Sequence, residues 1–291
     1  MKKRAMIYII LAGVLWGTSG IFVHYLSPYG FTSNQMTAMR ATVSFLCILI
    51  YALIKDRSLF CIKPSQLLLF AGIGISLFFT GSCYFASMQL TSVSTAVVLM
   101  YAAPIYVMIF SVLFLKEKLT AVKLISVACM LVGCCLVSGI VGGFAFDARG
   151  LLLGLFSGIS YAAYNVLTKI CVQKRIKPIT VTLYGFLFMA VIALSVMEPT
   201  SMLENIAAAP SVTLPMLIAL GICTFVLPYL LYTLAMKELT ASTASALAIV
   251  EPMAATLFSV ALFGERLTLL STAGILLILG AIVMIGKTEK D

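Results

Sequence analysis

The sequence predicts an all-α integral membrane protein of ten transmembrane helices, arranged as two inverted five-helix repeats. Three observations lead to this fold class. Of the 291 residues, 62% are hydrophobic and only 10% are charged, with a mean hydropathy of +1.15. Long apolar runs, separated by short polar segments, follow one another along the whole chain. In addition, the second half of the chain repeats the first.

This composition excludes a soluble protein. Soluble domains carry about 25% charged residues, and a chain with 10% has too few to cover its surface. The net charge of +9 does not indicate nucleic acid as a partner, because the lysines and arginines are scattered between apolar runs. None of the eight cysteines forms a C-x-x-C pair, so they indicate small core residues and predict neither a metal site nor a disulfide framework.

Ten apolar windows of about 19 residues predict the spans in order. The first five are expected near residues 5–26, 34–54, 66–87, 94–115 and 122–140, and the second five near 150–170, 179–198, 213–234, 242–263 and 270–286. Each is expected to be a helix, because an isolated strand leaves its backbone groups unpaired in lipid. The first window continues to Leu26 without a clear cleavage site, so we expect a span there and not a signal peptide.

The placement of positive charge predicts the orientation. If the N-terminus is cytoplasmic and the spans alternate, 16 of the 19 lysines and arginines fall on the cytoplasmic side. Arg149 and Arg266 fall outside, and Arg40 falls within a span. Because cytoplasmic loops are enriched in lysine and arginine, we expect a multi-pass protein of the plasma (inner) membrane with both termini in the cytoplasm.

Residues 84–120 match residues 232–268 at a constant offset of 148. The identical pairs include Tyr84/Tyr232, Ser94/Ser242, Pro104/Pro252, Glu117/Glu265 and Thr120/Thr268. A weaker match at an offset of 141 pairs Gly13 with Gly154 and Gly17 with Gly158. The chain is therefore expected to form two units, residues 1–143 and 146–291, of five spans each. Because five is odd, the second unit inserts upside down, which is the architecture of many secondary transporters.

Three stretches carry a resemblance to a known family. They are LWGTSGIF around Trp16 and Gly17, Pro104 followed by FLKEKLT, and Glu251-Pro252 followed by LFGERLT. Together with the repeat, they make the chain similar to the EamA-type branch of the drug/metabolite transporter superfamily over nearly its whole length. The resemblance implies a ten-helix carrier with a central cavity. Members export amino acids, their derivatives and other small metabolites, and some import, so the resemblance fixes neither substrate nor direction.

Residues that break the repeat are the first candidates for function. Glu251 is the only acidic residue inside a span, and the residue at the matching position of the first half is Ala103. An ionisable group near the middle of the bilayer costs about 2.5–3.5 kcal/mol on insertion scales. A fold that accepts Ala103 in one half does not need Glu251 in the other. Glu251 is expected to bind a substrate ammonium group or to carry a coupling proton; the alternative is a structural hydrogen bond between helices.

Arg40 is the only basic residue inside a span, and its approximate counterpart is Tyr184. It is expected either to hold a substrate carboxylate in a bidentate manner or to extend toward the membrane interface. Asn165, the only asparagine inside a span, is a candidate for hydrogen bonding. The aromatic residues Trp16, Tyr84, Tyr101, Tyr161, Tyr164 and Tyr232 offer amphipathic walls, of which Trp16, Tyr84 and Tyr232 are expected to line the cavity unless they serve packing alone.

Pairs that recur in both halves are expected to serve the fold. Gly13-x-x-x-Gly17 and Gly154-x-x-x-Gly158 form small-residue faces that let helices approach closely. Pro104 and Pro252 are expected in mid-helix, where each frees the carbonyl four residues earlier, at Met100 or Ala248. Each proline is expected to produce a kink that shapes the helix, or a hinge whose freed carbonyl faces a wet cavity. At the span ends, Glu117 and Glu265 are expected as solvated loop charges, and His24 as an interfacial residue or a proton relay.

The sequence therefore predicts a secondary carrier that uses no cofactor or metal. Gly286-Lys287-Thr288 matches the end of a phosphate loop, but Ala281 occupies the place of the first glycine. With one histidine and no H-E-x-x-H motif, an enzyme is not expected. The expected partners are a small molecule such as an amino acid or metabolite, the lipid bilayer and, if Glu251 couples, protons. Three alternatives stay open: facilitated diffusion, proton-coupled efflux of drugs or organic cations with Glu251 as counter-charge, and a non-transporting scaffold or sensor.

Overall fold

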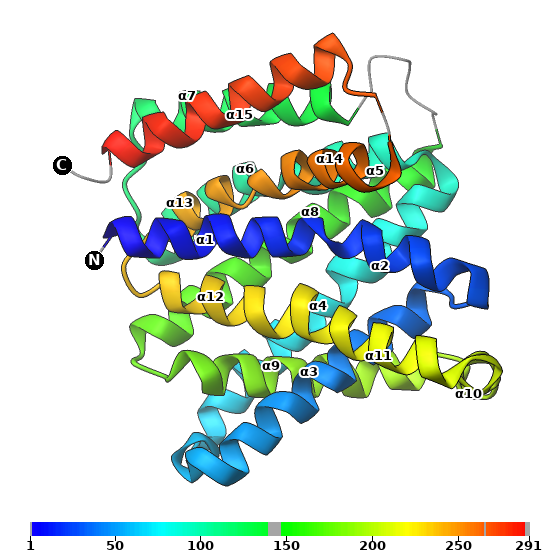
Figure 1. Cartoon of the computed structure of the whole chain (residues 1–291). Coiled ribbons are helices and arrows are strands. Elements are labelled where there is room, and N and C mark those ends of the chain that lie inside the picture. The colour runs from blue at the N-terminus through cyan, green and yellow to red at the C-terminus, as the bar shows by residue number, and fades with distance from the viewer. Residues whose placement is uncertain (1, 139–146, 265, 289–291) are drawn as a thin grey trace.

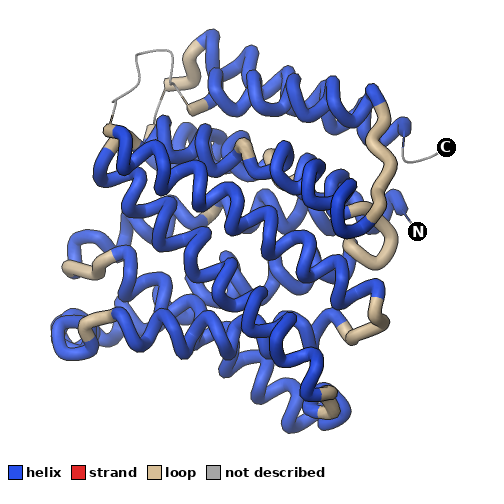
Figure 2. Tube along the Cα trace, turned by 180° about the vertical axis from the view of Figure 1, so that it is seen from behind, coloured by secondary structure: helices blue, strands red, loops and turns tan. Residues whose placement is uncertain are grey.

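The structure is a computed structural model that describes residues 2–138, 147–264 and 266–288, and within these ranges it contains helices and no strand (Figure 2). The first half comprises α1 (Lys2–Gly17), α2 (Ser19–Leu26), α3 (Ser33–Lys55), α4 (Pro64–Leu90), α5 (Val93–Tyr101), α6 (Ala103–Leu115) and α7 (Ala121–Val137). The second comprises α8 (Ala148–Gln173), α9 (Pro178–Val196), α10 (Pro199–Ala208), α11 (Pro210–Gly221), α12 (Leu227–Ala235), α13 (Ala241–Leu247), α14 (Val250–Phe263) and α15 (Leu269–Thr288). Three short turns are η1 (Ser27–Tyr29), η2 (Arg57–Phe60) and η4 (Ile222–Val226).

Nine helical stretches of the described chain are long and apolar enough to cross a bilayer. They correspond to every predicted span except the one expected at 122–140. At that place α7 has 17 residues, fewer than the roughly 20 that the hydrocarbon core requires, and residues 139–146 lie outside the described part. The chain is therefore an integral membrane protein, and the tenth span stays a prediction.

The capping residues show why equivalent helices begin at equivalent positions. Ser92 caps α5 and Thr240 caps α13, 148 residues further on. Thr120 caps α7 and Thr268 caps the start of α15 in the same relation. Each hydroxyl accepts a hydrogen bond from the backbone N–H three residues later. A donor that the first helical turn would leave unpaired is thereby satisfied.

Two spans are interrupted near their middle, at equivalent places. One break separates α5 from α6 at Ala102, and the other separates α13 from α14 at residues 248–249. Pro104 and Pro252 lie in the first turn of the second helix of each pair, and not inside a continuous helix as expected. Proline has no N–H to continue the hydrogen-bond ladder, so the preceding helix ends and a new one starts around it.

One of the two carbonyls expected to be freed by these prolines is paired. The carbonyl of Ala248 accepts a hydrogen bond from the Glu251 N–H at 3.0 Å, because the tight turn at that break brings this N–H close to it. The expectation of an unpaired carbonyl is therefore wrong at Ala248. At the other break the Ala102 N–H donates to the Val98 carbonyl at 3.1 Å, and the unpaired carbonyl of Met100 stays a prediction.

Each small-residue face packs against the interrupted span of the other half. A Cβ atom added to Gly17 on α1 would lie 2.9 Å from the Ala254 Cβ and 2.9 Å from the Ala255 N on α14. A Cβ atom added to Gly158 on α8 would lie 3.1 Å from the Leu99 carbonyl oxygen on α5. The predicted close approach of helices at these glycines is thus confirmed, and it is a contact between the two halves.

We expect Gly17→Leu to disrupt the packing of α1 on α14, because the added side chain meets backbone that cannot move aside. Overpacking of this kind costs about 1–3 kcal/mol. The measurement is the yield and thermal midpoint of the protein purified in detergent. Gly20→Leu is the matched control, since nothing lies within 4 Å of its Cβ position. Equal losses for both variants would show that hydrophobic bulk, and not the close contact, is responsible.

The helix contacts follow a pattern that is preserved when the halves are exchanged. α1 packs on α12 and α14 of the second half, and α8 packs on α4, α5 and α6 of the first. α3 packs on α9, and α7 on α15. Figure 1 shows α7 and α15 side by side at one edge of the bundle, and the start of α1 and the end of α15 at the same end of it.

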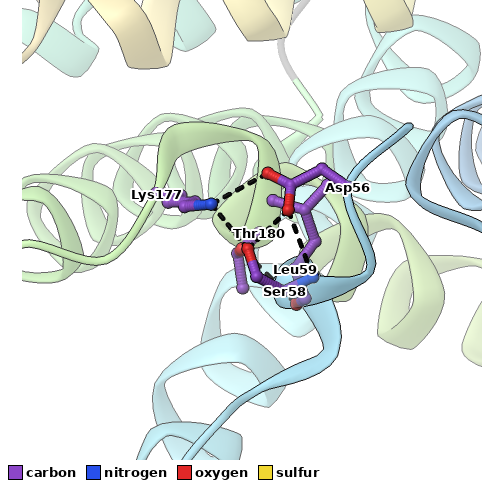
Figure 3. A network of polar contacts seen from close by, with 5 residues as sticks. All are labelled: Asp56, Ser58, Leu59, Lys177 and Thr180. Atoms are coloured by element: carbon purple, nitrogen blue, oxygen red, sulfur yellow. Dashed lines mark hydrogen bonds and ion pairs between the residues drawn. The ribbon is translucent and has the colours of Figure 1, made fainter.

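The pairing of α3 with α9 is tied at both ends. At one end Lys177, just before α9, donates hydrogen bonds to the Asp56 carboxylate at 2.8 Å and to the Ser58 hydroxyl at 2.6 Å (Figure 3). At the other end the amide nitrogen of Gln35 on α3 donates to the Ser201 hydroxyl of α10 at 2.8 Å. These ties indicate that α3 and α9 form a fixed pair.

The ion pair between Asp56 and Lys177 gives a testable pH dependence. The pKa of Asp56 lies below its ordinary value of 3.8 because Lys177 and Ser58 donate hydrogen bonds to the carboxylate. A carboxyl group with a depressed pKa stabilises the fold above its unfolded-state pKa, and this stabilisation is lost as the pH falls through the folded-state pKa. We expect Asp56→Asn to melt below the wild type at neutral pH, with the difference starting to shrink below about pH 4 and disappearing below the folded-state pKa of Asp56.

The thermal midpoint measured across pH checks this result. Lys177→Met should reproduce the loss at neutral pH, and the double variant should lose little more than either single variant, because both remove the same pair. A deficit of Asp56→Asn that persists in acid would contradict the assignment.

Candidate functional site

Glu251 lies in the first turn of α14, directly after the break that separates α13 from α14. Its side chain is half-buried. The Tyr101 hydroxyl and the Arg40 guanidinium are the polar groups that act most strongly on its carboxylate. Tyr84, Tyr161 and Tyr229 also lie within electrostatic range of it. The break in the span thus places one carboxylate among tyrosines from both halves.

Arg40 lies on α3 and is turned toward other helices of the bundle. Its guanidinium carbon lies 4.8 Å from the centre of the Phe225 ring of η4 and 5.9 Å from that of the Phe85 ring of α4. One terminal nitrogen donates to the Thr37 hydroxyl at 3.1 Å. Among the described residues, Arg40 and Glu251 influence each other electrostatically but form no ion pair.

Trp16 belongs to a continuous aromatic cluster that joins α1, α8, α9 and α12. Its ring centre lies 5.1 Å from that of Tyr229 and 5.5 Å from that of Tyr232. The Tyr229 ring centre lies 5.4 Å from that of Tyr164 and 5.0 Å from that of Phe225. Phe225 therefore connects this aromatic cluster to Arg40.

Asn165 and Tyr232 are fully buried and bind each other. The Tyr232 hydroxyl donates to the side-chain oxygen of Asn165, and the Asn165 amide nitrogen donates to the Tyr161 carbonyl at 2.7 Å. This pair therefore holds α8 against α12, and its main hydrogen-bonding groups are already occupied.

Of the aromatic residues expected to line the cavity, Trp16 is buried in the aromatic cluster, and Tyr84 is half-buried within electrostatic range of Glu251.

Three buried polar atoms at this place have no hydrogen-bond partner within the described protein. They are the Trp16 indole nitrogen, the Arg40 Nε and the Tyr164 hydroxyl. A buried donor left unpaired costs about 1–3 kcal/mol. Tyr164 and Tyr229 also line a small pocket together with Thr182, Thr233 and Phe186. Unpaired donors beside an aromatic cluster are what a site for a polar ligand requires.

Tyr229, Phe186 and Phe225 were not singled out from the sequence. Tyr229 precedes the candidate Tyr232 by three residues, so both lie on one face of α12, and this spacing is the signal that identifies it. Phe186 and Phe225 carry no such signal, because a phenylalanine in an apolar helix is expected to pack or to face lipid. Only the fold shows that they meet Tyr229 and Arg40.

The remaining candidates lie away from this cluster or outside the described residues. His24 is exposed at the end of α2, with its ring centre 4.3 Å from that of Phe263. Glu117 is not a solvated loop charge as expected. Its carboxylate accepts hydrogen bonds from the Ala241 N–H at 2.8 Å and from the Ser242 hydroxyl at 2.7 Å, because the loop after α6 reaches the start of α13. Glu265 lies outside the described residues.

A helical membrane bundle with opposite charges and unpaired donors beside an aromatic cluster has the features expected of a membrane transport protein. The model of the EamA-like transporter family matches residues 3–139 and again residues 148–287. The chain therefore belongs to the EamA-like transporter family, as the sequence motifs suggested, and it is a membrane transporter.

Relatives of the chain carry names of the same kind. An uncharacterized transporter of Archaeoglobus fulgidus is 30% identical over 276 residues, covering 95% of this chain and 94% of that one. The uncharacterized inner membrane transporter YicL of Salmonella typhimurium is 23% identical, covering 99% of this chain and 97% of that one. A crystal structure at 21% identity covers 100% of this chain and 99% of its own with a TM-score of 0.80, which shows that the fold is shared.

Proposed function

We propose that this protein is a secondary or facilitative carrier that exports amino acids or related small metabolites by alternating access. The observation that carries the proposal is the pair of opposite charges, Arg40 and Glu251, which share one region of the membrane interior without forming an ion pair. Each charge is costly to bury alone. A substrate with a carboxylate and an ammonium group compensates both.

In this binding mode the Arg40 guanidinium receives the substrate carboxylate and Glu251 receives the ammonium group. Guanidinium and carboxylate form paired, parallel hydrogen bonds, and the free Arg40 Nε supplies one of them. The unpaired indole N–H of Trp16 and hydroxyl of Tyr164 are available to polar atoms of the substrate. The aromatic cluster around Tyr229 supplies apolar walls for the rest of the molecule.

The ten-span, inverted-repeat architecture is part of the same proposal. It is supported by the offset of 148 between the interrupted spans, by the two matches of the family model and by helix contacts that persist when the halves are exchanged. Two nearly equivalent halves can adopt inward-open and outward-open forms of similar energy. The placement of the positive charges supports cytoplasmic termini, and the name of the Salmonella relative supports the inner membrane.

The contacts on the proposed cytoplasmic side support a form that is closed there. Glu117 joins the loop after α6 to α13. Lys169 at the end of α8 donates to the carbonyls of Met236 and Leu239, each at 2.6 Å. In the proposed cycle these hydrogen bonds break when the carrier opens to the cytoplasm.

Counterflow in proteoliposomes tests the function. Vesicles loaded with an unlabelled amino acid should take up the labelled form, and empty protein-free vesicles should not. Uptake of labelled tetraphenylphosphonium in place of amino acids would favour the alternative of organic-cation efflux, in which Glu251 and the tyrosines hold a cation. Exchange that does not respond to a pH gradient favours facilitated diffusion. A protein that exchanges no solute is a scaffold or sensor, and the proposal fails.

A further inference from the structure

The second half contains a helical irregularity that the described residues of the first half lack. Between α11 and α12, the turn η4 is wound as a π-helix, in which the Leu227 N–H donates to the Ile222 carbonyl. Pro228, the next residue, has no N–H to donate, and the Thr224 hydroxyl bonds to the Leu220 carbonyl at 2.6 Å. The repeat places Thr80 opposite Pro228, within the uninterrupted helix α4. Single π-turns of this kind are frequent at functional sites.

The π-turn sets Phe225 against Arg40. The hydroxyl of Ser44 on α3 lies one turn beyond Arg40 and donates to the Arg40 carbonyl at 2.6 Å and to the Gly221 carbonyl at 3.2 Å. Gly221 immediately precedes the π-turn, and a Cβ atom there would lie 2.7 Å from the Val43 Cγ1. These contacts fix α3 and the π-turn relative to each other. The Phe225 ring is thereby held 4.8 Å from the guanidinium carbon.

Arg40 and its two aromatic neighbours have unlike residues at the corresponding places of the other half. Phe85 pairs with Thr233 within the matched stretch, and the residue 148 positions before Phe225, just ahead of that stretch, is Leu77. A fold that tolerates Leu77 in one half does not require Phe225 in the other. The asymmetry of Arg40 and of the two rings that face its guanidinium indicates a function specific to this place.

We propose that Phe225 is the positioning residue for Arg40, and that it determines selectivity for substrates that carry a carboxylate. The inference rests on the proposed function. An aromatic face attracts a guanidinium without using its N–H donors, which lie in the guanidinium plane. The ring thus holds the charge in place while the Nε and the second terminal nitrogen stay available. Without the ring, the guanidinium is free to move toward Glu251, the carboxylate within its electrostatic range. An ion pair between them would remove both substrate-binding charges.

Trp16 makes the test direct, because it is the only tryptophan of the chain and belongs to the aromatic cluster. The purified protein is titrated with L-leucine, L-threonine and L-lysine, and with the carboxamide of each, while Trp16 fluorescence is followed. The wild type should bind each acid more tightly than its amide. Phe225→Leu should reduce this preference by about tenfold, the range expected for a desolvated cation–π contact.

Two variants separate positioning from packing. Phe225→Tyr keeps the aromatic face and should retain the preference for the acid. Phe70→Leu removes a buried ring outside the site, which stacks on Tyr184 at 5.1 Å and does not lie over Arg40, and it too should retain the preference. If the wild type prefers the acids and Phe225→Leu prefers them equally, the inference fails while the proposed function stands. If the wild type shows no preference, the carboxylate role of Arg40 and the inference fail together.

Discussion

Glu251→Gln is expected to reduce amino acid counterflow by about 100-fold, because truncating one partner of a buried charge pair costs about 2–5 kcal/mol. The physical reason is the loss of the only acidic group inside a span, which leaves the substrate ammonium without a counter-charge. The variant should also lose the pH dependence of exchange, since the glutamine side chain does not titrate. The measurement is initial counterflow of labelled amino acid at several pH values in proteoliposomes.

Glu238→Gln is the control for this experiment, because Glu238 is exposed in the turn between α12 and α13. It removes the same negative charge at a place outside the site. Retained Trp16 fluorescence and a single species by gel filtration would show that Glu251→Gln is folded. Wild-type rates and an unchanged pH profile in Glu251→Gln would refute both the ammonium-binding role and the proton-coupling role.

Arg40→Gln is expected to produce the complementary defect. Substrates with a carboxylate should lose about 30- to 100-fold in affinity, as for one partner of a desolvated charged hydrogen bond, whereas amines without a carboxylate should bind as before. Removing a guanidinium that has no ion-pair partner from the membrane interior also removes a desolvation cost, so we expect folding to survive. Competition of the acids and of their amines against a labelled amino acid measures the effect.

Arg40→Lys distinguishes charge from geometry. Lysine keeps the positive charge but cannot form two parallel hydrogen bonds, so an intermediate loss of acid binding is expected. A collapse of folded yield in both Arg40 variants would instead assign Arg40 a structural role through Thr37, Phe85 and Phe225. Equal losses for acids and amines would also contradict the assignment of the carboxylate to Arg40.

Much of the fold followed from local signals. The apolar windows located nine of the spans. Each of them is a helix, because in lipid a helix pairs all its backbone hydrogen-bonding groups within itself. The glycines at positions 13, 17, 154 and 158 identified the close contacts between helices. The prolines marked the spans that are interrupted. They did not predict that the Ala248 carbonyl would be paired, because the hydrogen bonds at a helix break depend on how the next turn is packed.

The candidate site was predictable only where a residue is unusual for its surroundings. Glu251 and Arg40 stand out because a charge inside a span is expensive. Asn165 stood out as the only asparagine inside a span, and the structure pairs it with Tyr232. Phe225 and Phe186 did not stand out at all, because an apolar side chain has the same cost facing lipid as facing another helix.

The sequence by itself determined that the chain is a helical membrane protein of two related halves. It also determined which side chains cost too much free energy inside a span to serve packing alone. Only the tertiary structure decided which of these residues meet: Glu251 with the tyrosines, Asn165 with Tyr232, Arg40 with Phe225, and Glu117 with the start of α13. The physical reason is that hydrophobicity is a property of each residue and its near neighbours along the chain. Contacts between residues far apart in the sequence, such as Asn165 and Tyr232 at 67 positions and Glu117 and Ala241 at 124, depend instead on how whole helices cross.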